Sequence, residues 1–146
     1  MQISYRHGTV EDILSVSAAI PEFENLYAKE VYQERFEQSP KHLILVAYDE
    51  DIPVGFKAGY QKSNDGSFYS WMGAVLPAYR KQKIAKNLAD QMEDWAKKEG
   101  YSSIIFKTRN YLKAMQIFGI SNGFQIIDFE KREPIEQSRI LLQKFL

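Results

Sequence analysis

The sequence predicts an α/β fold of the α+β type, and three observations carry this prediction. Short β-favouring runs alternate with longer segments whose apolar residues recur at helical spacing. Turns rich in glycine, asparagine and aspartate separate these segments. With 146 residues, of which 45% are hydrophobic, the chain also suits a globular domain with a sizeable core. We expect a single domain over residues 1–146 with the element order β-α-α-β-β-β-α-β-α-β-β.

The elements of the first half follow from capping signals and turns. Thr9 followed three residues later by Asp12 is typical of a helix start, because each side chain can bind a backbone N–H of the first turn. An acidic turn at 49–51 joins two apolar runs, as expected for neighbouring strands. The expected elements are a strand at 3–6, a helix from Thr9 to about Ile20, a helix from about Phe23 to Gln38, and strands at 42–48 and 53–60.

The elements of the second half begin after a hairpin signal, Asn64-Asp65-Gly66. The aromatic run that follows favours a strand, and Pro77 ends it because proline cannot donate to a sheet ladder. Gly100 is expected to cap the next helix at its C-terminal end. The expected elements are strands at 68–75 and 102–108, a helix from about Ile84 to Gly100, a helix capped by Asn110 that runs to about Phe118, and strands at 124–130 and 139–146.

A basic turn joins the aromatic strand to the central helix. The first turn of a helix presents backbone N–H groups without intrahelical acceptors, at the positive end of the helix dipole. Phosphate and pyrophosphate groups bind at such positions. The cations nearby are Arg80, Lys81, Lys83 and Lys86. An ordinary strand–turn–helix with a solvated basic corner explains the same residues, so the turn by itself leaves both interpretations open.

The residues of this turn resemble the acyl-CoA signature of the GNAT N-acetyltransferase superfamily. Val-x-Pro-x-Tyr-Arg-x-x-x-Ile-Ala at 75–85 is similar to the family's Arg/Gln-x-x-Gly-x-Gly/Ala pattern after a strand. Arg80 and Ala85 fit its first and last positions. Lys83 stands where the middle glycine is usual, and Lys81 where a second glycine is common. Glycine there lets the backbone approach the pyrophosphate closely, and the two lysines could offset its loss by direct charge.

The late part of the chain extends the resemblance. Residues 110–124 resemble the family's Asn-x-x-Ala…Tyr-x-x-x-Gly-Phe segment, with a good match at Gly123-Phe124 and a looser one at Asn110 and Ala114. The expected element order matches that of the family along the full length. The resemblance therefore implies a GNAT acyltransferase fold, in which helices flank a mixed, mostly antiparallel central sheet.

The resemblance implies direct transfer of an acetyl group from acetyl-CoA, as co-substrate, to a primary amine of a small molecule or peptide. Backbone groups of Gly73 and Val75 would hold the pantetheine arm, although Gly73 is nearly as well explained as a packing glycine. The complete set of expected cofactor-binding residues is Gly73, Val75, Arg80, Lys81, Gln82, Lys83, Ile84, Ala85, Lys86 and Asn110.

The acid–base groups are less clearly indicated. Tyr69 aligns where several members carry a carboxylate base, and Gly119 where many carry a tyrosine acid. Tyr69 could protonate the leaving thiolate, or water could, and Glu24 could deprotonate the amine, although surface glutamates more often only complement a helix dipole. Strand alternation places Tyr69, Trp71, Gly73 and Val75 on one face. The expected acceptor-site residues are Glu22, Phe23, Tyr27 and Trp71, which suit a small amine with an apolar portion or a peptide N-terminus.

Composition limits the partners. Nineteen basic and 19 acidic residues give a formal net charge of zero, which offers no support for a nucleic-acid or anionic-membrane partner. The absence of cysteine excludes disulfides and thiolate nucleophiles, and two distant histidines make a zinc site unexpected. The N-terminus lacks the apolar core of a signal peptide, so a cytoplasmic location is the expectation. A homodimer is compatible with these features.

Two other classes of protein remain to be compared with the enzyme. A non-catalytic acyl-CoA sensor of the same fold would keep the pyrophosphate turn and lose the acid, which Gly119 permits. A nucleotide-binding protein of another fold would need a Walker-type loop, and the sequence contains none. The enzyme is therefore the leading interpretation and the sensor its alternative.

Overall fold

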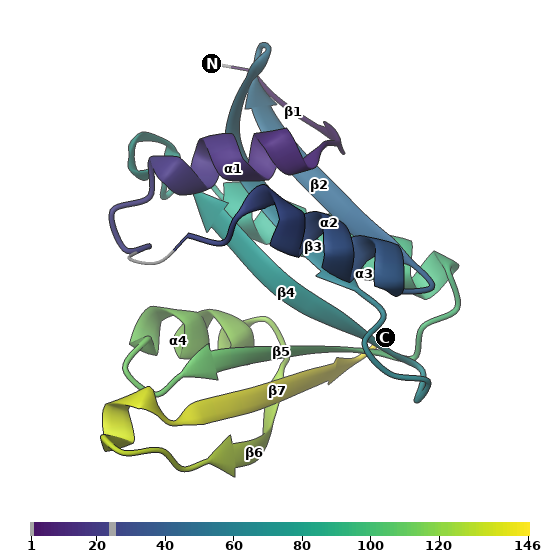
Figure 1. Ribbon diagram of the computed structural model, residues 1–146, viewed down its shortest axis with the longest axis vertical. Helices are drawn as coiled ribbons and strands as arrows, with labels where there is room; N and C mark the ends of the chain where they lie inside the picture. The colour runs from purple at the N-terminus through teal and green to yellow at the C-terminus, as the bar shows by residue number, and fades with distance from the viewer. Residues whose placement is uncertain (1, 24–25) are drawn as a thin grey trace.

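The chain folds around one seven-stranded sheet, as the computed structural model shows (Figure 1). The structure describes residues 2–23 and 26–146. The strand order is β1-β2-β3-β4-β5-β7-β6, and the element order agrees with the prediction. In the described residues the elements are β1 (Ile3–His7), α1 (Val10–Ala18), α2 (Lys29–Gln38), β2 (His42–Asp49), β3 (Ile52–Tyr60), β4 (Ser67–Val75), the 3₁₀ turn η1 (Pro77–Tyr79), α3 (Ile84–Lys98), β5 (Ser103–Arg109), α4 (Lys113–Ser121), β6 (Gln125–Glu130), η2 (Ile135–Gln137) and β7 (Arg139–Phe145).

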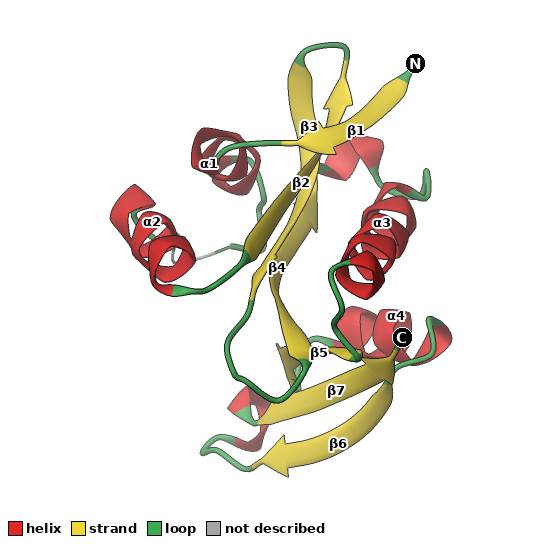
Figure 2. Ribbon diagram, turned by 90° about the vertical axis from the view of Figure 1, so that its right-hand side faces the viewer, coloured by secondary structure: helices red, strands yellow, loops and turns green. Residues whose placement is uncertain are grey.

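Helices cover both faces of the sheet. Figure 2 shows α1 and α2 on one side and α3 and α4 on the other, and we call these the α1–α2 face and the α3–α4 face. Tyr32 and Phe36 of α2 are buried on the first face, and Leu88 and Met92 of α3 are buried on the second. Burial of these apolar surfaces is the main stabilising contribution to such a layered fold. No helix in the described part of the chain is long and apolar enough to cross a membrane.

Local sequence signals account for most element ends. Thr9 and Asp12 form the expected capping box, in which the Thr9 N–H donates to Asp12 Oδ2 at 3.0 Å and the Asp12 N–H donates to Thr9 Oγ1 at 3.3 Å. Gly66, Gly100 and Gly123 have φ values of 88°, 93° and 91°, which glycine adopts without steric cost. The predicted helix start at Thr9, the turn at Gly66 and the helix end at Gly100 are confirmed.

Two predicted helix starts are wrong. The second helix begins at Lys29 rather than about Phe23, so Glu22 lies in a turn that precedes it. The last helix has Leu112 at its N-cap without a side-chain cap. Asn110 is not that cap, because its side-chain amide donates to the Ile135 carbonyl at 3.3 Å instead.

Strands β4 and β5 part in the middle of the sheet. They pair in parallel over Ser67–Tyr69 and Ser103–Ile105 and not beyond. The rest of β5 pairs with β7, while the rest of β4 pairs with β3. Figure 1 shows the two strands diverging from this junction. The inner edge of β4 from Trp71 onward is therefore left without a strand partner in the described residues.

Strand β4 has a β-bulge where it parts from β5, and this bulge changes which side chains share a face of the sheet. Ala58 pairs with Met72 and Gly59 pairs with Ser70, so Trp71 is the extra residue. A bulge interrupts the alternation of side chains along a strand. Tyr69 and Trp71 pack with the α1–α2 core, whereas Val75 packs with the α3 core. The prediction that Tyr69, Trp71, Gly73 and Val75 share one face is therefore wrong.

Candidate active site

A cavity of about 230 Å³ lies between the end of β4, the start of α3 and helix α4. Seven of the ten residues expected to bind the cofactor line it. Its full lining is Val75, Tyr79, Arg80, Lys81, Lys83, Ile84, Ala85, Lys86 and Phe118. Phe118 comes from α4 and was not predicted from the sequence, because only the fold brings α4 opposite the turn. The expected residues Gly73, Gln82 and Asn110 do not line the cavity.

The first turn of α3 contains backbone N–H groups without a hydrogen-bond partner among the described residues. Lys83 is the N-cap and has no side-chain cap, and the first helical hydrogen bond runs from the Asn87 N–H to the Lys83 carbonyl at 2.9 Å. The N–H groups of residues 84–86 have no acceptor in the described part of the chain. Together with the positive end of the helix dipole, they can bind the oxygens of a phosphate group.

Lys81 and Lys83 adopt a backbone conformation that favours glycine. Each has a φ of 63°, in the left-handed region. These are the positions at which the resemblance led us to expect glycine, and the backbone there has the conformation that glycine adopts without steric cost. A non-glycine residue in this conformation costs roughly 1 kcal/mol. Both lysines are exposed, and neither has an ion-pair partner among the described residues.

Arg80 is held by the protein rather than directed freely at the cavity. Its Nε donates to the Val75 carbonyl at 3.1 Å, and its two terminal nitrogens lie 2.9 and 3.2 Å from the two carboxylate oxygens of Glu22. The hydrogen bond from Arg80 lowers the pKa of the Glu22 carboxyl. Lys86 is similarly paired with Asp90 one turn along α3. The structure therefore connects the expected acceptor residue Glu22 with the expected cofactor residue Arg80.

Gly73 lies in the part of β4 that has left β5. A Cβ atom at this position would lie 3.2 Å from the carbonyl oxygen of Phe56 on β3. This distance is tighter than nearly all contacts of Cβ atoms in proteins, so packing already favours glycine here. A role for its backbone in holding a pantetheine arm remains a prediction.

Aromatic side chains gather on the α1–α2 face where β4 and β5 part. Trp71 lies 5.7 Å from Tyr27 and 5.5 Å from Tyr60 between ring centroids, and Tyr69 lies 5.5 Å from Tyr60. Phe23 packs against the hydrophobic core of the same face. The structure thus brings Tyr27 and Trp71, two of the residues expected at the acceptor site, into contact. Glu24, the expected base, lies outside the described residues.

The environment of Tyr69 weakens its hydroxyl both as a proton donor and as a proton acceptor near neutral pH. Burial raises the pKa of its hydroxyl to about 12, and the neighbouring Tyr60 adds to the shift. A phenol with this pKa stays protonated near neutral pH, so it is a poor general base. Its hydroxyl has no hydrogen-bond partner in the described part of the chain.

Gly119 is required by packing. It is buried on α4, where a Cβ atom would lie 2.7 Å from Phe106 Cζ and 3.2 Å from Leu142 Cδ2. At the position where the family commonly places a tyrosine, any side chain would therefore force Phe106 to shift. The sequence signal was the glycine itself, and the structure supplies its steric reason.

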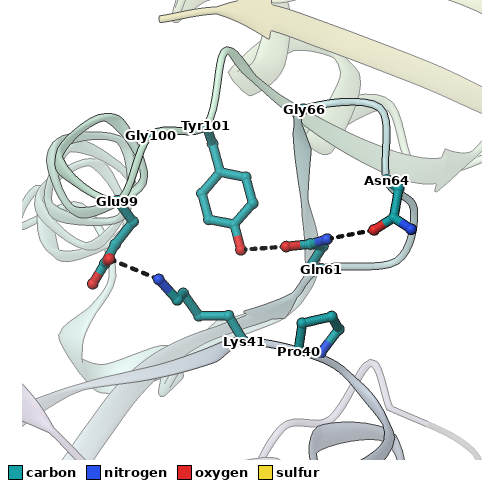
Figure 3. Close-up of a pocket in the computed structure, with 8 residues that line it drawn as sticks. All are labelled: Pro40, Lys41, Gln61, Asn64, Gly66, Glu99, Gly100 and Tyr101. Carbon is teal, nitrogen blue, oxygen red and sulfur yellow. Dashed lines mark hydrogen bonds and ion pairs between the residues drawn. The ribbon is translucent and has the colours of Figure 1, made fainter.

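A second cavity, of about 300 Å³, lies at the opposite end of β4 (Figure 3). Its polar groups bind one another. Lys41 forms an ion pair with Glu99 at 2.8 Å, and the Tyr101 hydroxyl donates to Gln61 Oε1 at 2.8 Å. The amide of Gln61 in turn donates to Asn64 at 3.0 Å. Its lining residues are Pro40, Lys41, Gln61, Asn64, Gly66, Glu99, Gly100 and Tyr101. These pairings leave few groups for a ligand.

Strands β4 and β5 part beside the start of α3, where backbone N–H groups are free of acceptors in residues 2–23 and 26–146. This arrangement is the one expected for the class of acyltransferases that the sequence resembles. The family model of the acetyltransferase (GNAT) family matches residues 13–124, and the chain belongs to this family. A sequence comparison with curated proteins gives no significant match.

Solved structures share the fold over almost the whole chain. The NatC complex bound to Gag peptide and CoA contains a chain that superposes with a TM-score of 0.84 at 23% identity, over 100% of this chain and 99% of that one. The ribosomal-protein-S18-alanine N-acetyltransferase from Escherichia coli superposes with a TM-score of 0.83 at 12% identity, covering 99% and 94%. A GNAT family acetyltransferase from Elizabethkingia anophelis with acetyl-CoA bound gives 0.77 at 19% identity, covering 99% and 98%. At these identities the similarity establishes the fold.

Proposed function

We propose that the protein is an N-acetyltransferase that moves the acetyl group of acetyl-CoA to a primary amine of a small molecule or peptide. The observation that carries this proposal is the cavity at the start of α3, whose free amides and exposed Lys81 and Lys83 suit a pyrophosphate. Membership of the acetyltransferase (GNAT) family supports it, as does the acetyl-CoA in the related Elizabethkingia structure.

The parting of β4 and β5 gives the co-substrate a path from one face to the other. The pyrophosphate would bind at residues 81–86 on the α3–α4 face. The pantetheine arm would run along the free edge of β4 and bind its backbone groups as a sheet neighbour does. The thioester would then reach Tyr69 and Trp71 on the α1–α2 face, where the acceptor amine binds.

The reaction we propose is direct attack without an acyl-enzyme. The neutral amine nitrogen forms a bond to the acetyl carbon, the carbon–sulfur bond breaks, and CoA leaves as a thiolate. The extra proton on nitrogen passes to water, and the thiolate takes a proton from water. Because a thiol has a pKa of about 8.5, the thiolate leaves readily without a dedicated acid. The packing of Gly119 is therefore compatible with activity.

Thiol release tests this function. The protein should release free CoA from acetyl-CoA only when a primary amine is present, and mass spectrometry should find one added acetyl group on that amine. Calorimetry should detect CoA binding that weakens as salt concentration rises, since lysine charges contribute. Binding of CoA without thiol release for any amine would favour the sensor alternative, and absence of CoA binding would contradict both.

The Tyr69→Phe variant separates water from tyrosine as the proton donor. Proton transfer from a hydroxyl with a pKa of about 12 to a thiolate is unfavourable. We therefore expect Tyr69→Phe to lower kcat only about two- to fivefold, with unchanged CoA affinity. A general acid typically contributes at least roughly 100-fold. A loss of that size at full CoA binding would identify Tyr69 as the acid.

A further inference from the structure

Positive side chains converge on the α1–α2 face beside Tyr69 and Trp71. The guanidinium carbon of Arg35, on α2, lies 4.6 Å from the centroid of the Trp71 ring. The Nζ atom of Lys62, in the loop between β3 and β4, lies 4.7 Å from the centroid of the Tyr69 ring. Two strands from the other half of the sheet add Lys107 and Arg139. We call Arg35, Lys62, Lys107 and Arg139 the acceptor-face cations.

The register of the sheet places Lys107 and Arg139 on this face. Phe106 and Ile140, their neighbours along β5 and β7, pack together under α4 on the other face. Because side chains alternate along a strand, Lys107 and Arg139 lie on the α1–α2 face. Ile105 is opposite Tyr69 at the last pair between β4 and β5, so Lys107 lies two residues beyond the point where the strands part.

The acceptor-face cations act on one another. Burial lowers the pKa of the Lys62 amine, and Lys107, Arg35 and Arg139 lower it further. The charged groups that shift the pKa of Tyr69 are Arg35 and Arg139. No carboxylate within residues 2–23 and 26–146 contributes to either shift. Within the same ranges, none of the four cations forms an ion pair.

Clustered like charges that lack an ion-pair partner, as these do within residues 2–23 and 26–146, oppose folding unless a ligand neutralises them. The proposed mechanism brings two groups to this face, the uncharged acetyl thioester and the acceptor, so a charged partner for the cations has to come from the acceptor. On the basis of the proposed function, we infer that the acceptor amine carries an anionic group, a carboxylate or a phosphate, which the acceptor-face cations bind. Arginine and lysine are the side chains best suited to such groups.

The same charges assist the chemistry. A positive field disfavours the ammonium form of a nearby amine, so it favours the neutral form that attacks the thioester. This effect supplies part of what a carboxylate base would supply. Glu22, which we expected at the acceptor site, is paired with Arg80. Polycationic acceptors are accordingly the ones that this face excludes.

Matched acceptors that differ only in charge provide the test. Thiol release with acetyl-CoA would be measured for glutamate against glutamine, for O-phosphoserine against serine, and for the peptide amide Ala-Asp-Glu-Ala against Ala-Asn-Gln-Ala. We expect the anionic member of at least one pair to have a kcat/KM roughly 10- to 100-fold higher, with the advantage falling as salt rises. The pair that shows it distinguishes a small carboxylate, a phosphate and an acidic peptide as the source of the anion.

Two variants connect the preference to the acceptor-face cations. Lys107→Met and Arg139→Met should each reduce the anionic advantage at least about threefold while CoA affinity stays unchanged, which also shows that the variants fold. Lys97→Met is the matched control, because Lys97 is an exposed lysine on α3, on the opposite face. It should keep the full advantage. An advantage that survives both variants would contradict the inference.

The outcomes separate this inference from the proposed function. Acetylation in which neutral or polycationic amines are the better acceptors would overturn the inference and leave the acetyltransferase intact. Absence of thiol release with every amine would contradict the proposed function. In that case, calorimetry would measure binding of the same acceptor pairs to CoA-saturated protein. Tighter binding of the anionic members would support the inference, and equal binding of both members would overturn it.

Discussion

Substitution of Ala85 by glutamate should lower the affinity for CoA by about 100-fold or more. Ala85 lines the cavity in the first turn of α3, and its backbone N–H is among those expected to bind the pyrophosphate. A carboxylate placed there repels the phosphates by several kcal/mol at short range in a partly screened site. The folded state should survive, because a negative side chain at a helix N-terminus stabilises the helix by roughly 0.3–1 kcal/mol. Calorimetry with CoA and thermal unfolding measure the two effects separately.

Gln91→Glu is the control for this prediction. It introduces the same charge on α3, six residues further along the helix and outside the cavity lining. We expect CoA affinity within about threefold of the original protein, since the added charge is distant and partly screened. Equal CoA affinity for Ala85→Glu and Gln91→Glu would show that the pyrophosphate binds elsewhere.

The element order and the basic turn were predictable because each rests on local patterns. Thr9 with Asp12, and the glycines at 66, 100 and 123, mark element ends through short-range geometry. The strand-to-helix turn is equally local, and Lys81 and Lys83 adopt the left-handed backbone that favours glycine, the residue expected there from the resemblance.

The acceptor side of the site was harder to predict because it depends on contacts between distant segments. The bulge at Trp71 is set by pairing between β3 and β4, and strict alternation along the sequence cannot reveal it. Arg35, Lys62, Lys107 and Arg139 lie on separate elements and share no spacing in the sequence. The start of α2 was misplaced because charged residues near Phe23 also suit a helix, while the chain enters a turn there.

Gly119→Ala should lower the free energy of unfolding by about 1 to 3 kcal/mol, the range usual for an overpacked core. This loss should occur although alanine is the better helix former by about 1 kcal/mol. The cause is the distance of 2.7 Å between the new Cβ and Phe106 Cζ. Denaturant unfolding measures it, and a double-mutant cycle with Phe106→Leu isolates the contact. Because leucine lacks the Cζ atom, the double variant should lose less stability than the sum of the two single variants.

The same contact predicts the fate of a tyrosine at this position. Gly119→Tyr would force an aromatic ring against Phe106 and Leu142, and we expect the free energy of unfolding to fall by more than about 4 kcal/mol. This is a large part of the roughly 5–15 kcal/mol that stabilises an ordinary domain, so the melting temperature should drop sharply. The tyrosine acid common in the family would therefore strongly destabilise this protein, which agrees with our proposal that water protonates the leaving thiolate. A Gly119→Tyr variant that unfolds at the original temperature would contradict this explanation, and a higher kcat in that variant would show that the acid had been lost for another reason.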